Sequence, residues 1–170
     1  ANQFGQTKLD WWDRNAPLPH SSEKLIQWSE ARDIILDSFS SFHPEISNLA
    51  KLFFKNNWID ASLRKGKASG AFAHPSVPSL HPYILVNYQG KIRDVMTLAH
   101  ELGHGVHQIL AGKNGLLMAE TPLTLAETAS VFGEMLVFRK LLDKSPIEQK
   151  KQLLSGKIED MLNTVARQIG

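Results

Sequence analysis

Residues 94–112 are DVMTLAHELGHGVHQILAG, and the placing of apolar residues in this stretch decides the fold of the chain. These residues recur with the period of an α-helix, and on a helical wheel with His100 at zero they fall in an arc of about 160° to 280°. The residues in the arc are Val95, Leu98, Ala99, Leu102, Val106, Ile109 and Leu110. With Asp94 as the N-cap and Gly112 as the stop, the pattern predicts one long helix with a single buried face.

The other side of the same helix carries histidines. His100, His104 and His107 fall within about 30° of a common direction, well away from the apolar arc. Two histidines four residues apart lie about 40° apart around a helix and roughly 6 Å apart along it, so both imidazoles can reach one ion. Glu101 projects about 100° away from His100, beside that ion. A His-Glu-x-x-His helix is typical of zinc peptidases, so we predict His100 and His104 as ligands of one Zn²⁺ per chain and Glu101 as the general base.

The third metal ligand must come from outside this motif. The metzincin pattern requires Gly and His at the positions where this chain has His107 and Leu110, so that class is excluded. The other common solution takes a Glu from a following helix and leaves the fourth position to water. The segment from Thr121 to Leu142 predicts such a helix, with Thr121 as the N-cap and Pro122 at the first helical position.

Two glutamates of that second helix, Glu127 and Glu134, share an apolar stripe, where a carboxylate is costly to bury unless it is paired or bound to a metal. Glu127 follows His104 by 23 residues, which is enough chain for the first helix to end and the second to return alongside it. We therefore predict Glu127 as the third ligand. Glu134 is the second choice, and otherwise the acceptor of a hydrogen bond from a ligand imidazole. A capping box with Thr124 is the rival role for Glu127, and His107 is expected beside a ligand or facing the substrate.

Glycines mark two further places where close approach is expected. Gly103 and Gly105 each cost the helix about 1 kcal/mol relative to alanine, so another element or a substrate is expected to approach them. Upstream, we predict Gly70, Ala71 and Phe72 as substrate-binding residues of an exposed strand edge that pairs with an extended peptide. The alternative is a strand that starts at the glycine and buries Phe72 in the core.

The remaining sequence predicts a mainly helical fold. Residues 1–20 are expected to be an irregular lead-in, and helices are expected over 22–41, from Pro44 to about Asn57, and from Ser145 to near Ile169. Residues 68–74 and 83–88 are strand candidates. We predict a single domain over residues 1–170, with a helical zincin-type catalytic core and a small β element before the HExxH helix.

The composition is that of an ordinary globular protein. Of the 170 residues 42% are hydrophobic and 21% charged, which argues against a disordered chain. No apolar run approaches the roughly 20 residues that span a bilayer, and the formal net charge of +2 is too small and scattered to indicate nucleic-acid binding. The basic cluster at residues 64–67 is interpreted as a solvated turn, and the alternative is contact with a peptide carboxylate or the backbone. The lack of cysteine agrees with a reducing cytoplasm.

The stretch TLAHELGHGVHQIL, followed by LAETASVFGEMLVF, resembles the oligoendopeptidase F branch of the thimet-oligopeptidase-like zinc metallopeptidases. The flanking segments KLDWWDRNAPLP, IDASLRKGKASGAFAH and PYILVNYQGKIRDVMTLAHELGH agree, so the likeness covers most of the chain. The resemblance implies His100, His104 and Glu127 as zinc ligands and Glu101 as general base. It also implies a mostly helical catalytic fold around a deep channel that admits short peptides but not folded proteins.

Members of this family supply oxyanion donors, a His and Tyr residues, from a segment C-terminal to the zinc helices. This chain has only Tyr83 and Tyr88 and ends at Gly170, so we expect an internal piece of a longer enzyme whose partner is the rest of its catalytic domain. The predicted function is zinc-dependent cleavage of short peptides by a metal-activated water. The alternatives are a catalytically incompetent, zinc-stabilised peptide-binding fragment and a structural zinc module closed by His107 or Glu134.

Overall fold

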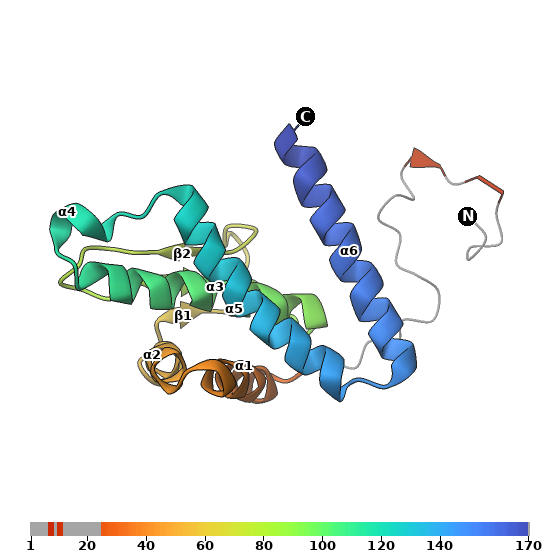
Figure 1. The fold of residues 1–170 in the computed structure, drawn as a ribbon, viewed down its shortest axis with the longest axis horizontal. Coiled ribbons are helices and arrows are strands. Elements are labelled where there is room, and N and C mark those ends of the chain that lie inside the picture. The colour runs from red at the N-terminus through yellow and green to blue at the C-terminus, as the bar shows by residue number, and fades with distance from the viewer. Residues whose placement is uncertain (1–6, 9, 12–24, 170) are drawn as a thin grey trace.

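The computed structural model describes residues 7–8, 10–11 and 25–169, so most of the expected lead-in lies outside the described residues. The helix expected over 22–41 begins only at Trp28, since residues 25–27 are described and are not helical. The elements follow the order α1 (Trp28–Phe42), α2 (Pro44–Lys55), β1 (Ile59–Asp60), β2 (Phe72–His74), β3 (Tyr83–Leu85), α3 (Ile92–Gly112), α4 (Leu116–Ala119), α5 (Leu123–Lys144) and α6 (Ile147–Ile169) (Figure 1). This architecture confirms the prediction of a mainly helical fold with a small β element before the HExxH helix.

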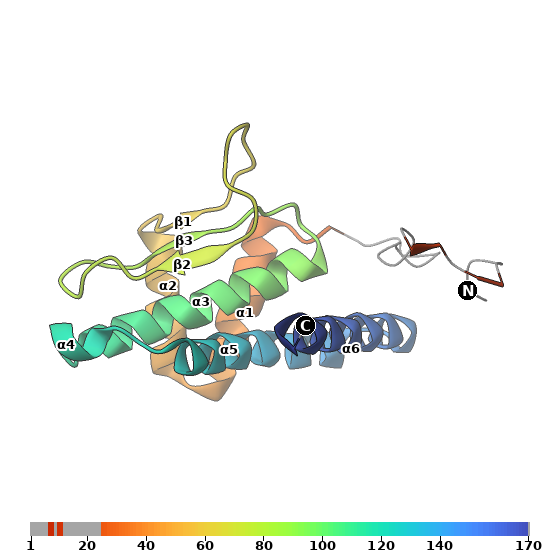
Figure 2. The same ribbon diagram turned by 90° about the horizontal axis from the view of Figure 1, so that it is seen from above.

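The central helix, α3, lies between the sheet and α5 (Figure 2). Its apolar arc is buried as predicted, with Val95, Leu98 and Leu102 fully enclosed, whereas Ile109 near the C-terminal end is only partly covered. The core that surrounds this arc takes residues from every layer, including Ile35, Phe39, Phe53, Ile84 and Val137. Because α3 supplies much of this core, the opposite side of α3 is held in a fixed place.

The start of α3 differs from the prediction. Lys91 is the N-cap, and Asp94 stands three residues later, where its Oδ2 accepts hydrogen bonds from the backbone N–H groups of Lys91 at 3.0 Å and Gln89 at 2.8 Å. The prediction of Asp94 as N-cap is therefore wrong, because the carboxylate caps the helix from inside its first turn. The predicted stop at Gly112 is confirmed.

The start of α5 also differs, by one residue. Pro122 has an extended ψ of 145° and forms the N-cap, so Thr121 lies outside the helix and Leu123 is the first helical residue. A capping box requires its Ser or Thr at the N-cap, and Thr124 already lies inside α5. The rival role for Glu127 as a capping residue is therefore excluded.

The three strands form a sheet in the order β1-β3-β2, with β1 parallel and β2 antiparallel to β3. Ile84 of β3 pairs with Ile59 on one side and with Ala73 on the other. The strands β2 and β3 are shorter than the predicted ones, and the two-residue β1 was too short to give a periodic signal. The strand β2 lies at an edge of the sheet and packs beside α3.

The last helix, α6, turns back from the end of α5 (Figure 1). Its described side chains include six exposed apolar residues, namely Ile147, Leu154, Ile158, Met161, Leu162 and Val165. None of the described helices combines the length and the apolar character needed to cross a bilayer.

Candidate metal centre

Glycines let α3 and α5 come unusually close. A Cβ on Gly103 would lie 2.8 Å from the Cα of Ser130 and 2.9 Å from the carbonyl oxygen of Ala129, both backbone atoms of α5. From the other side, a Cβ on Gly133 would lie 3.2 Å from the carbonyl oxygen of Ala99. The expectation that another element approaches Gly103 is confirmed. We call this contact the glycine crossing.

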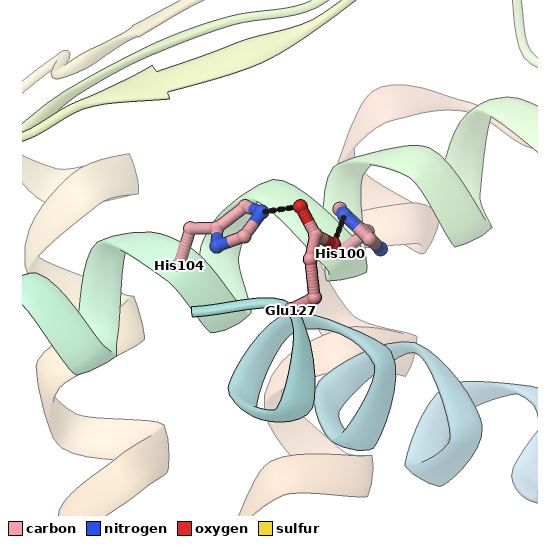
Figure 3. A group of neighbouring side chains, drawn as sticks. All are labelled: His100, His104 and Glu127. Atoms are coloured by element: carbon pink, nitrogen blue, oxygen red, sulfur yellow. Dashed lines mark ion pairs between the residues drawn. The ribbon is translucent and has the colours of Figure 1, made fainter. Parts of the chain in front are cut away.

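The glycine crossing brings three predicted ligands together. His100 Nε2 lies 3.3 Å from Glu127 Oε2, and His104 Nε2 lies 3.7 Å from Glu127 Oε1 (Figure 3). One ligand atom from each of the three residues can be chosen so that all lie within 4.8 Å of one another. A tetrahedral zinc ion with bonds of about 2.1 Å requires ligand atoms roughly 3.4 Å apart. Two imidazole nitrogens and a carboxylate at these distances therefore fit Zn²⁺ in both donor type and spacing.

Glu134 contacts the other nitrogen of His100. Its Oε2 lies 3.2 Å from His100 Nδ1, and its Oε1 accepts a hydrogen bond from Lys157 Nζ of α6 at 2.5 Å. A carboxylate in this position holds the proton on Nδ1 and leaves the Nε2 lone pair for a metal. Burial alone would raise the pKa of Glu134, but the hydrogen bonds from His100 and Lys157 outweigh it and lower that pKa.

The pKa values of the two imidazoles are shifted in opposite directions. Burial works to lower the pKa of His100, yet the surrounding carboxylates, first Glu134 and then Glu101 and Glu127, raise it overall. For His104 burial is again the largest cause, the nearby His100 adds to it, and the pKa is lowered. A lowered pKa keeps His104 neutral near neutral pH, which is the form that binds a metal.

Glu101 is a buried carboxylate with an unusual environment. Only 6% of the residue is exposed, and its Oε2 has no hydrogen-bond partner among the described residues. Burial raises the pKa of Glu101 to about 7 against a lowering by His100, and Glu127 adds a smaller increase. A carboxylate that titrates near neutral pH is suited to accept and return a proton.

The remaining predicted site residues lie around this centre. His107 lines an apolar cavity of about 140 Å³ together with Phe39, Val106 and Phe132, and its predicted role near a ligand or substrate stays a prediction. The alternative that Phe72 lies in the core is wrong, because the residue is 46% exposed at the start of β2.

Gly70 and Ala71 precede this strand. Gly70 has a positive φ of 86°, and its carbonyl oxygen accepts a hydrogen bond from Asn87 Nδ2 at 3.0 Å. One residue past Phe72, the carbonyl oxygen of Ala73 accepts from Gln108 Nε2 of α3 at 3.4 Å. This contact places the β2 edge one helical turn from His104. The binding of a peptide at Gly70, Ala71 and Phe72 stays a prediction.

Two lysines have roles that the sequence did not reveal. Lys67 was interpreted as part of a solvated turn, but its ammonium is buried and donates to backbone oxygens of Asp60, Ser62 and Val86, so that interpretation is wrong for this residue. Lys157 lies on α6, 23 residues after Glu134, and its ammonium donates a hydrogen bond to the Glu134 carboxylate. Neither contact follows a helical or strand period, so no sequence signal could have indicated it.

Comparison with known proteins agrees with this geometry. Residues 30–169 match the sequence profile described as Peptidase family M3. The chain belongs to peptidase family M3. The match covers both α3 and α5 and confirms the family resemblance drawn from their sequences.

The relatives of this M3 chain are oligopeptidases. It is 30% identical over 161 residues to Oligopeptidase PepF of Bacillus subtilis (strain 168), covering 92% of the chain and 24% of that protein. It is 34% identical over 159 residues to the chromosomal Oligoendopeptidase F of Lactococcus lactis subsp. cremoris, covering 92% and 26%. The chain thus spans about a quarter of the length of these relatives.

A solved structure has the same arrangement of elements. The crystal structure of a candidate peptidase from Chlamydophila abortus superposes with a TM-score of 0.80 at 32% identity, covering 99% of this chain and 28% of the other. PZ peptidase A, solved with an inhibitor, superposes with a TM-score of 0.71 at 20% identity over 82% of this chain and 25% of its own, which supports the fold alone.

Proposed function

We propose that this M3 chain forms the zinc-binding core of an endopeptidase that hydrolyses short peptides. The observation that carries the proposal is the gathering of His100, His104 and Glu127, whose ligand atoms lie within 4.8 Å of one another, with the buried Glu101 next to His100. The names of the relatives support peptide hydrolysis, and the rest of the catalytic domain in such longer proteins would complete the substrate channel.

In the proposed mechanism the chain provides a metal cradle and a proton carrier. His100, His104 and Glu127 would hold Zn²⁺, which supplies Lewis acidity and lowers the pKa of water toward about 7. Glu134 keeps the proton of His100 on Nδ1, so that Nε2 stays a donor to the metal. The carboxylate of Glu101 accepts a proton from the attacking water and returns it to the leaving amine. Its pKa of about 7 favours this role.

The structural-zinc alternative is less well supported. A structural zinc site is closed by four protein ligands. Among the described residues, the cluster that could hold a metal ion contains three side chains. The two residues that could close it are placed otherwise: Glu134 contacts His100 and Lys157, and His107 lines an apolar cavity. An arrangement with three ligands leaves a position for water, as hydrolysis requires. The peptide-binding alternative gives no role to the buried carboxylate of Glu101.

The test is a quenched-peptide cleavage assay on the full-length protein with Glu101→Gln. We expect zinc content to stay near one per chain while turnover falls by roughly 10³-fold or more, since the proton carrier is lost. The matched control is Glu120→Gln, which removes an exposed carboxylate at the end of α4 and should cleave normally. Near-normal turnover by the zinc-loaded Glu101→Gln protein would refute the proposed mechanism, and a wild-type protein without bound zinc would refute the metal site itself.

A further inference from the structure

Ser130 stands one helical turn after Glu127 on α5 and is fully buried. Its Oγ lies 3.0 Å from the carbonyl oxygen of Glu127 and 3.1 Å from Glu127 Oε2. A hydroxyl carries one proton, and an ionised carboxylate is acceptor-only and binds a donor more strongly than a neutral carbonyl does. The hydroxyl of Ser130 therefore donates to the carboxylate when Glu127 is ionised.

The backbone of Ser130 is fixed by the glycine crossing. A Cβ added to Gly103 would lie only 2.8 Å from the Cα of Ser130, so the two backbones are in direct contact. Gly103 lies between His100 and His104 on α3, so Ser130 Oγ is anchored against the same turn that presents both imidazoles. This fixed donor therefore has a defined position relative to the two nitrogens.

Glu127 itself is less constrained than the histidines it approaches. Its side chain is 46% exposed, against 23% for His100 and 15% for His104. A half-exposed glutamate has several rotatable bonds, and ordering it when a metal binds costs free energy. A hydrogen bond that orders the carboxylate beforehand reduces that cost.

We propose that Ser130 is a positioning residue, whose hydroxyl orients the Glu127 carboxylate toward His100 and His104 before a metal binds. The inference rests on the proposed zinc site and adds to it the device that preorganises its third ligand. It acts through Glu127, so its effect must appear in metal affinity and must vanish when Glu127 is absent.

The experiment measures the zinc dissociation constant of the full-length protein with a competing chromophoric chelator. Ser130→Ala removes the hydroxyl without adding volume at the glycine crossing, and we expect the zinc Kd to rise roughly 3- to 10-fold. The matched control is Thr128→Ala on the same helix, whose exposed hydroxyl donates only to the Thr124 carbonyl at 2.8 Å. It should leave the zinc Kd within about twofold of wild type.

The readout that separates positioning from packing is a double-mutant cycle with Glu127→Ala. In the Glu127→Ala background, Ser130→Ala should change the zinc Kd by less than about twofold. An unchanged Kd in Ser130→Ala alone, or an equal loss in both backgrounds, would overturn the inference. Failure of the wild type to bind zinc would instead refute the proposed function, so the two failures are distinguishable.

Discussion

Two glycines of α3, two residues apart, meet very different neighbours. A Cβ on Gly103 would collide with the backbone of α5 at Ser130 and Ala129, whereas a Cβ on Gly105 would collide with the ring of Phe53 from α2, at 2.5 Å from Cζ. The first contact lies beside the candidate metal centre and the second inside the apolar core. A glycine on one side of α3 thus sets the geometry of the candidate metal centre, whereas a glycine on the other side leaves room for a core side chain.

The two sides of α3 also have opposite effects on the stability of the fold. The core side buries apolar groups such as Leu98 and Leu102, which stabilises the fold. The metal side buries Glu101 with an oxygen that has no partner among the described residues, which costs stability. Functional sites commonly hold such unfavourable groups because the rest of the structure compensates for them.

The largest effect is expected for Gly103→Ala. The new methyl group meets backbone atoms that cannot rotate away, so α3 and α5 must separate, and Glu127 moves away from the imidazoles. We expect the free energy of unfolding to fall by about 3 kcal/mol, despite the better helix propensity of alanine, and the zinc Kd to rise at least tenfold. Denaturant unfolding and a zinc titration measure the two effects, and an unchanged zinc Kd would contradict the role given to the glycine crossing.

The next effect is expected for Glu101→Gln in the zinc-free protein, and it depends on pH. The pKa of Glu101 is about 7 in the folded chain and near 4.5 ordinarily, so the folded state binds its proton more tightly. Its stability contribution is therefore full below pH 4.5 and is lost as the pH rises through 7. Relative to wild type, we expect Glu101→Gln to gain about 3 kcal/mol of stability between pH 4 and pH 8. Denaturant unfolding over this range measures the gain, and a difference that does not vary with pH would refute the assigned pKa.

Next in size is Glu134→Gln, which tests the metal side without replacing a proposed ligand. An amide holds the Nδ1 proton of His100 less firmly than a carboxylate does, so we expect the zinc Kd to rise roughly tenfold, equivalent to about 1.4 kcal/mol. Asp143→Asn, an exposed acid in the last turn of α5, is the control and should bind zinc as wild type does. If both variants lost the same affinity, general charge and not the contact with His100 would be responsible.

The smallest effect is expected for Gly105→Ala, on the core side. Overpacking against the buried ring of Phe53 and the gain in helix propensity oppose each other, which leaves a net loss of about 1 kcal/mol in unfolding free energy. The zinc Kd should stay within about twofold of wild type, in contrast to Gly103→Ala. Adding Phe53→Leu should cost less in the Gly105→Ala protein than in the wild type, because the space is already short. A large zinc effect of Gly105→Ala would remove the distinction between the two sides.

The sequence predicted the histidine pair without help from the fold. His100 and His104 are neighbours because a helix places residues four apart on one side, whatever surrounds it. The buried arc of α3 follows from the same period, and its placement is confirmed. The sequence was less accurate at the helix starts, where Pro122 and Lys91 are the N-caps, because several nearby polar residues could serve there.

The sequence favoured Glu127 over Glu134 as a ligand, but which nitrogen of His100 each glutamate meets depends on the crossing of two helices. The two glutamates are seven residues apart, about 10 Å along α5, so the point where α5 crosses α3 decides which one meets which nitrogen of His100. The glycine crossing places Glu127 at Nε2 and Glu134 at Nδ1. A sequence pattern leaves that point undetermined, because it depends on the packing of backbone against backbone.

Local periodicity by itself determined that this chain has a central amphipathic helix with an HExxH face and a second helix with two glutamates on one stripe, and the resemblance of these two motifs indicated the family. Only the tertiary structure decided the neighbours of Gly103 and Gly105, the packing of Ser130 against Gly103, and the contact of the Lys157 ammonium with Glu134. The reason is the range of the interactions. Helical geometry acts over a few residues, whereas these contacts join segments whose separation along the chain carries no period.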